Sequence, residues 1–65
     1  MIVNMADITQ ATDPVTDKVV LRAVSNTARE WMCDQWGEPE VKLDAEDAQD
    51  FLEEAAENGF DVAAA

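Results

Sequence analysis

The sequence predicts a small α/β (α+β) domain, in which two helices pack on one face of a sheet of three or four strands. Short apolar or alternating segments, typical of strands, precede segments whose apolar residues recur at helical spacing. Glycine, proline and asparagine mark several boundaries between them. The length of 65 residues allows one domain with a modest core. The expected order is strand, helix, strand, helix, strand.

The N-terminal segment, residues 1–17, is predicted to be an arm or loop. Its apolar residues suit a short edge strand: Ile2, Val3, Met5 and Ile8. Residues 9–14 are predicted to form a loop, because Pro14 disfavours helical geometry in the residue before it. The compact domain is therefore expected over residues 18–62, followed by a tail at residues 63–65.

A strand and then the first helix are predicted to follow this arm. Residues 18–24 are rich in valine and can place alternate side chains on opposite faces of a sheet. The helix is expected to begin within residues 25–27. Thr27 and Glu30 have the spacing of a capping box, and Asn26 is an alternative cap.

The first helix has one apolar face. The residues of this face are Ala28, Trp31, Met32 and Trp36. Gly37 suits a left-handed C-cap, and Pro39 prevents the helix from continuing. Cys33, the single cysteine, is expected to be a small core residue, and an unpaired cysteine favours a reducing, cytoplasmic setting.

A short strand, the second helix and a last strand complete the prediction. Residues 40–43 are the strand, and Asp44 is expected to cap the helix. The apolar stripe of this helix is Ala48, Phe51, Leu52, Ala55 and Ala56. Gly59 suits its end, and Phe60 suits the hydrophobic contact beside such a cap. Residues 60–62 are predicted to be the last strand.

Charge is the most informative property of the composition. Fifteen acidic residues oppose four basic ones, giving a net charge of −11. This balance argues against direct nucleic-acid binding and against docking on anionic membranes, both of which need clustered lysine and arginine. No apolar run approaches the roughly 20 residues of a membrane span, and no signal peptide is expected. A basic partner is the natural counterpart, although acidity can also serve solubility or adaptation to high salt.

The chemical inventory argues against catalysis. The chain has no histidine and no tyrosine, and its two glycines suit helix ends better than a phosphate-binding loop. We expect neither an enzyme nor a cofactor. The stretch from Asp44 to Asp50 has some similarity to a calcium-binding loop, but Gln49 and Ala55 stand where glycine and glutamate are needed. No metal site is therefore predicted.

Six acidic residues and no basic residue occupy the predicted second helix. Four of them follow the spacing i, i+4, i+7, i+11 along one face: Glu46, Asp50, Glu53 and Glu57. Asp47 and Glu54 flank this row, and Asp34, Glu38 and Glu40 are expected to extend it. Like charges four residues apart destabilise a helix, so the row is interpreted as a surface for lysine and arginine of a partner. The alternative is a solvated helix face without a partner.

The two tryptophans allow two interpretations. Trp31 and Trp36 are five residues apart, which turns a helix by about 140°. One ring is then expected in the core, and the other partly exposed as an interface anchor. Alternatively, both rings cover the core.

The profile resembles small phage-encoded anti-CRISPR proteins of the DNA-mimic kind, which act on type I surveillance complexes. The resemblance rests on size and charge, on the acidic helix from Asp44 to Glu57, and on Asp34, Glu38 and Glu40, and not on a motif. It implies occupation of a DNA-binding surface. An example is the basic groove with which the large Cas subunit reads target DNA.

The sequence therefore leads to one functional hypothesis and one rival. The hypothesis is a cytoplasmic inhibitor that binds a basic, nucleic-acid-binding protein of a bacterial host through its carboxylates, without chemistry. The rival is an antitoxin-like or assembly-partner module, which binds through an apolar or tryptophan surface and is acidic only for solubility.

Overall fold

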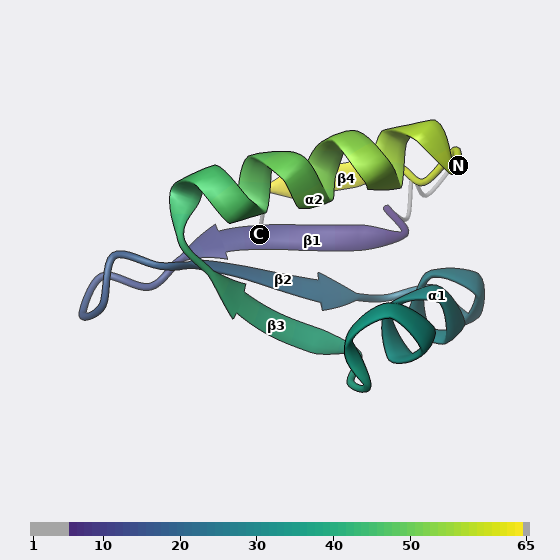
Figure 1. The fold of residues 1–65 in the computed structure, drawn as a ribbon, viewed down its shortest axis with the longest axis horizontal. Helices are drawn as coiled ribbons and strands as arrows, with labels where there is room; N and C mark the ends of the chain where they lie inside the picture. Colours follow the sequence, from purple (N-terminus) through teal and green to yellow (C-terminus); the bar gives the residue numbers. More distant parts are fainter. Residues whose placement is uncertain (1–5, 65) are drawn as a thin grey trace, which may run out of the picture.

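Two helices cover one face of a four-stranded sheet in the computed structural model, which describes residues 6–64 (Figure 1). The elements in chain order are β1 (Ile8–Thr12), β2 (Val19–Ala23), α1 (Asn26–Trp36), β3 (Glu40–Leu43), α2 (Ala45–Glu57) and β4 (Val62–Ala64). The predicted α/β class and the order of the two helices and their flanking strands are confirmed. The sheet has the larger of the two expected numbers of strands.

The sheet has the strand order β3-β2-β1-β4. β2 pairs antiparallel with both β1 and β3, whereas β4 pairs parallel with β1. Ile8 is therefore in register with Ala23 on one side and with Val62 on the other. β1 is an interior strand, and within residues 6–64 β3 and β4 form the two edges.

The prediction for the N-terminal segment is right about a strand at Ile8 and a loop at residues 13–14, but wrong about residues 9–12. Ile8–Thr12 is an interior strand, and not an arm with a loop at residues 9–14. Ile8 is the only large apolar residue in this strand, so the sequence shows no hydrophobic alternation there. The strand is held in place by its pairing with β2 on one side and β4 on the other. The domain limits of 18–62 are too narrow, because β1 and the end of β4 lie outside them. Ile2, Val3 and Met5 lie outside the described residues.

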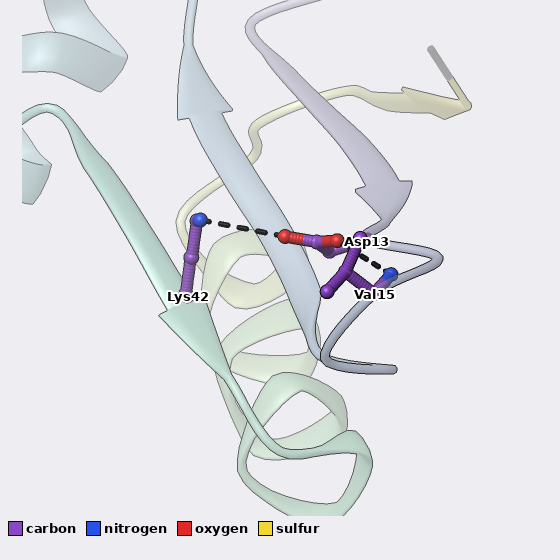
Figure 2. A network of polar contacts seen from close by, with 3 residues as sticks. All are labelled: Asp13, Val15 and Lys42. Carbon is purple, nitrogen blue, oxygen red and sulfur yellow. Dashed lines mark hydrogen bonds and ion pairs between the residues drawn. The ribbon is translucent and has the colours of Figure 1, made fainter.

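The loop between β1 and β2 is closed by its own main chain. The N–H of Asp13 donates to the carbonyl of Lys18 at 2.8 Å, and the N–H of Asp17 donates to the carbonyl of Asp13 at 2.8 Å. The Asp13 carboxylate accepts from the N–H of Val15 at 2.9 Å and from Lys42 Nζ at 3.4 Å (Figure 2). The second contact reaches across β2, so it ties the loop to β3.

One hydrophobic core lies between the sheet and both helices. It consists of Ile8, Leu21, Ala23 and Val41 from the sheet, Ala28 and Met32 from α1, and Ala48, Phe51 and Ala55 from α2. Because both helices contribute to this cluster, they pack on the same face of the sheet, as predicted. On the other face of the sheet, Arg22, Glu40 and Lys42 are exposed.

The N-terminus of α1 differs in detail from the prediction. Ser25 is the N-cap, and its Oγ accepts a hydrogen bond from the N–H of Ala28 at 3.1 Å. Asn26 and Thr27, the predicted caps, lie inside the helix and are exposed. The serine hydroxyl does the same kind of capping one to two residues earlier, for the N–H of Ala28. At the other end, Gly37 has the predicted left-handed conformation with φ 79°.

Two further residues differ from their predicted environments. Cys33 is exposed, because it follows the buried Met32 by one residue and is therefore turned about 100° away from the core. Asp44 occupies the N-cap position of α2, but its carboxylate accepts no hydrogen bond from the helix. It lies 3.7 Å from Lys18 Nζ instead, so an ion pair takes the place of the cap.

Candidate functional site

The acidic residues of α2 form one exposed surface. We call this surface the acidic face; its members are Glu46, Asp47, Asp50, Glu53, Glu54 and Glu57, and all six are exposed. The opposite side of α2 buries Ala48, Phe51 and Ala55 against the sheet. Burial of that side fixes the rotation of α2 about its axis, and the carboxylates consequently project away from the sheet.

Internal cations do not neutralise the acidic face within the described part of the chain. The two ion pairs there join Lys18 to Asp44 at 3.7 Å and Lys42 to Asp13 at 3.4 Å. Both lysines are thus engaged outside α2. Among residues 6–64, neither Arg22 nor Arg29 forms an ion pair with this face. The six carboxylates therefore keep their charge available to an external partner.

The arrangement of these carboxylates costs helix stability. Glu46 and Asp50, Asp50 and Glu54, and Glu53 and Glu57 are like-charge pairs four residues apart on α2. Each pair costs about 0.2–0.5 kcal/mol, so the three together cost about 1 kcal/mol. The last turn of α2 has no basic residue, and Glu57 lies near the negative end of the helix dipole. The buried side of α2 has to offset this repulsion.

The three remaining acidic residues of the predicted site do not all join the acidic face. Asp34 is exposed on α1, and Glu38 lies in the turn before β3. Glu40 is in register with Arg22 on the sheet face that faces away from the helices. Figure 1 shows that β3 forms the edge of the sheet away from β4, whereas α2 runs alongside β4. Glu40 therefore does not lengthen the row of carboxylates on α2.

All four aromatic rings gather between α1 and α2. The ring centroid of Trp31 lies 5.5 Å from that of Trp36 and 5.4 Å from that of Phe51. Phe60 lies 5.2 Å from Trp31, and Trp36 lies 4.8 Å from Phe51. Both tryptophans are half-buried and pack against the core, which is the second interpretation of the sequence. Their long side chains converge although their backbone positions differ by about 140° around the helix.

Local hydrogen bonds lower the pKa values of two carboxylates outside α2. The pKa of Asp7 is lowered from its ordinary value by a hydrogen bond from the N–H of Asp61 and a further one from Ser25. The pKa of Asp13 is lowered chiefly by the N–H of Val15, with Lys42 as a smaller cause. Both residues are structural, and the sequence pattern carried no signal for either role.

Two shallow hollows on the described part of the surface lie outside the acidic face. One, of about 270 Å³, is lined by Gln10, Ala11, Thr12, Val19 and Ala64. The other, of about 380 Å³, is lined by Arg22, Ala23, Arg29, Pro39 and Glu40. Within residues 6–64 no three acidic or cysteine side chains are grouped to hold a metal ion. The stretch from Asp44 to Asp50 forms the N-cap and first turns of α2. The candidate site is an open charged surface.

Comparison with known proteins gives no assignment: no protein-family model, curated protein or solved structure matches the chain. The helices in residues 6–64 are too short or too polar to cross a bilayer.

Proposed function

We propose that the protein is a stoichiometric inhibitor, which binds a basic, DNA-binding protein of a bacterial host and excludes DNA by mimicking its charge. The observation that carries this proposal is the acidic face of α2, where six exposed carboxylates have no cationic partner within residues 6–64. A helix that needs only solubility gains stability from interspersed lysines at i, i+4. This helix has none and retains three repulsive pairs.

The spacing of the carboxylates supports a phosphate-like role. From Glu46 to Glu57 the helix rises roughly 16 Å, so the four residues of the main row carry about one charge per 5.5 Å. One strand of DNA carries a charge about every 3.4 Å. The face is less dense than DNA, but Asp47 and Glu54 widen it on one rigid helix. Lysine and arginine side chains of a partner can therefore reach several carboxylates at once.

The proposed partner is a basic groove that normally holds DNA. In line with the resemblance stated for the sequence, we propose the large Cas subunit of a type I CRISPR surveillance complex, in the cytoplasm of a bacterium. Long-range attraction between a chain of charge −11 and such a groove speeds their encounter. The same attraction makes binding sensitive to salt, because the screening length falls from about 10 Å at 0.1 M to about 3 Å at 1 M.

The test is a DNA competition assay with matched charge-reversal variants. The variant D50K/E53K/E54K reverses the centre of the acidic face. The control V15K/T16K/E30K/D61K makes the same change of net charge at exposed residues outside the predicted site. We expect the wild-type protein and the control to displace target DNA from the surveillance complex at low salt, and the α2 variant to lose displacement while its circular dichroism stays native.

Three results would contradict the proposal. Equal loss in both variants would show that net charge, and not the acidic face, governs binding. Undiminished displacement by the α2 variant would favour the rival module with an apolar or tryptophan surface. Binding that does not weaken with salt would remove the electrostatic mechanism itself.

A further inference from the structure

β3 is an edge strand with main-chain groups that face outward. The N–H of Ala23 donates to the carbonyl of Pro39 at 2.9 Å, one step beyond the paired Arg22 and Glu40 in the register of β2 and β3. Hydrogen-bonded pairs alternate along an antiparallel ladder, so Val41 is bonded towards β2. The N–H and C=O groups of Glu40 and Lys42 consequently point away from β2. No other described residue hydrogen-bonds to them.

The side chains along this edge are complementary to those of a second copy. Glu40 and Lys42 are exposed on the same face of the sheet, one residue on either side of Val41. A two-fold axis at Val41 places Glu40 of one copy directly opposite Lys42 of the other, twice in the interface. Each pair is then joined by reciprocal main-chain hydrogen bonds and by opposite charges, which stabilise cross-strand pairs.

We propose that β3 pairs antiparallel with β3 of a second copy, with Val41 opposite Val41. The pairing joins the two sheets into one continuous sheet across a two-fold, self-complementary interface. It buries a short edge on each copy, so the dimer is weak, with a Kd on the order of 1 mM.

The charges next to the edge extend this complementarity. Arg22 is in register with Glu40, so in the dimer each Glu40 lies between a cation of its own chain and Lys42 of the second copy. Asp13 contacts Lys42 across β2, as Figure 2 shows, so each Lys42 likewise lies between two carboxylates. Asp13, Arg22, Glu40 and Lys42 together have no net charge. A contact through these four residues therefore adds no net repulsion between two chains of charge −11.

The dimer leaves the proposed inhibitory surface accessible. β3 is at one edge of the sheet and α2 covers the opposite face from the Glu40 and Lys42 side chains, running alongside β4 at the other edge (Figure 1). A dimer thus presents two acidic faces. The dimer does not depend on the proposed function, and the two respond oppositely to salt: screening weakens attraction to a basic partner but relieves repulsion between two acidic copies.

Sedimentation equilibrium and amide hydrogen exchange, measured on the full chain up to about 1 mM, test this proposal. We expect self-association that increases with added salt. The amides of Glu40 and Lys42 should exchange more slowly as concentration rises, whereas the Val41 amide is protected at every concentration. A monomer throughout this range, or unchanged exchange at Glu40 and Lys42, would overturn the proposal.

Charge variants separate edge pairing from general repulsion. E40K and E30K both change the net charge from −11 to −9. E30K, on α1 and so outside the paired strands, should strengthen self-association slightly, whereas E40K should weaken it several-fold by placing two lysines opposite each other. The swap E40K/K42E should recover part of the loss: opposite charges face each other again across the interface, but Arg22 and Asp13 then each lie beside a like charge of their own chain. Equal behaviour of E30K and E40K, or no recovery in the swap, contradicts the proposed register.

The variant K42P removes one outward N–H without removing a bond to β2, a position where an edge strand tolerates proline. We expect native circular dichroism and no dimer. Association of a folded K42P protein at the wild-type level would overturn the proposal.

Discussion

Asp7 and Asp61, 54 residues apart in the chain, hold each other through reciprocal hydrogen bonds. The N–H of Asp7 donates to the carbonyl of Asp61 at 3.0 Å, and the N–H of Asp61 donates to Asp7 Oδ2 at 3.0 Å. The carbonyl of Asp7 also accepts from the N–H of Val24 at 2.7 Å. One residue thus connects the starts of β1 and β4 with the segment that leads into α1.

This link predicts a loss of stability in acid. The pKa values of Asp7 and Asp13 are lower in the folded protein than their ordinary value of 3.8, so the unfolded chain takes up these protons first as pH falls. Their stabilisation is present above about pH 4 and is lost as pH falls through the folded pKa values. We expect the urea midpoint of wild type to exceed that of D7N at pH 7, and the difference to shrink as pH falls below about 4.

The control for this prediction is D61N, which removes a carboxylate that does not form the link while keeping its N–H group. Its midpoint should stay near that of wild type at pH 7. A constant difference between wild type and D7N from pH 7 to pH 2 would contradict the role given to Asp7.

The N-cap of α1 can be tested against the capping box that the sequence predicted. S25A removes the Oγ that accepts from Ala28 and that also hydrogen-bonds Asp7, and it should reduce the free energy of unfolding by about 1 kcal/mol or more. T27A affects an exposed residue inside the helix and should change it by less than about 0.5 kcal/mol. Urea denaturation of both variants checks the order, and a larger effect of T27A would favour the predicted box.

The acidic face should show opposite effects on stability and binding. Asp50 lies four residues from both Glu46 and Glu54, so D50K replaces two repulsive pairs with two attractive ones. The free energy of unfolding should rise by about 1 kcal/mol. The affinity for the basic partner should fall, as measured by DNA competition. A variant that is destabilised, or that binds as well as wild type, would show that the repulsion is not retained for binding.

The aromatic cluster should matter for folding and not for partner binding. W31A removes contacts with Trp36, Phe51 and Phe60 and should cost about 3 kcal/mol. W31F keeps an aromatic ring and should cost less than about 1.5 kcal/mol, with DNA competition unchanged. V15A, at a side chain that is 89% exposed, is the control and should be neutral. Lost competition by folded W31F would favour the rival module.

Regular patterns in the sequence predicted much of this fold. Residues 18–24 alternate, α1 and α2 have apolar stripes, and Gly37 follows the last periodic residue, so β2 and both helices could be located by local rules. The exposure of the acidic face of α2 was predictable for the same reason, because the apolar stripe of a helix shows which side is buried and therefore which side is exposed. Local rules do not report pairing between distant strands, and β1 has too few apolar residues to show itself without β2 and β4.

Other features depended on three-dimensional neighbours. Cys33 has a side chain that suits the core, but the rotation of α1 about its axis places it at the surface. Asp44 has a side chain that suits a helix cap, but it forms an ion pair with the nearby Lys18 instead. The two tryptophans converge because Phe51 and Phe60 arrive from other parts of the chain. The position of Glu40 beside Arg22 required the register of β2 and β3.

The parallel pairing of β1 with β4 has a consequence for synthesis. The ribosome makes β1 early and β4 last among the described elements. β1 can therefore pair with β4 only after residues 62–64 have emerged. A nascent chain halted after α2 already contains every carboxylate of the acidic face, but on an unfinished sheet. We therefore expect the complete sheet to form only after residues 62–64 have left the ribosome, in one late step.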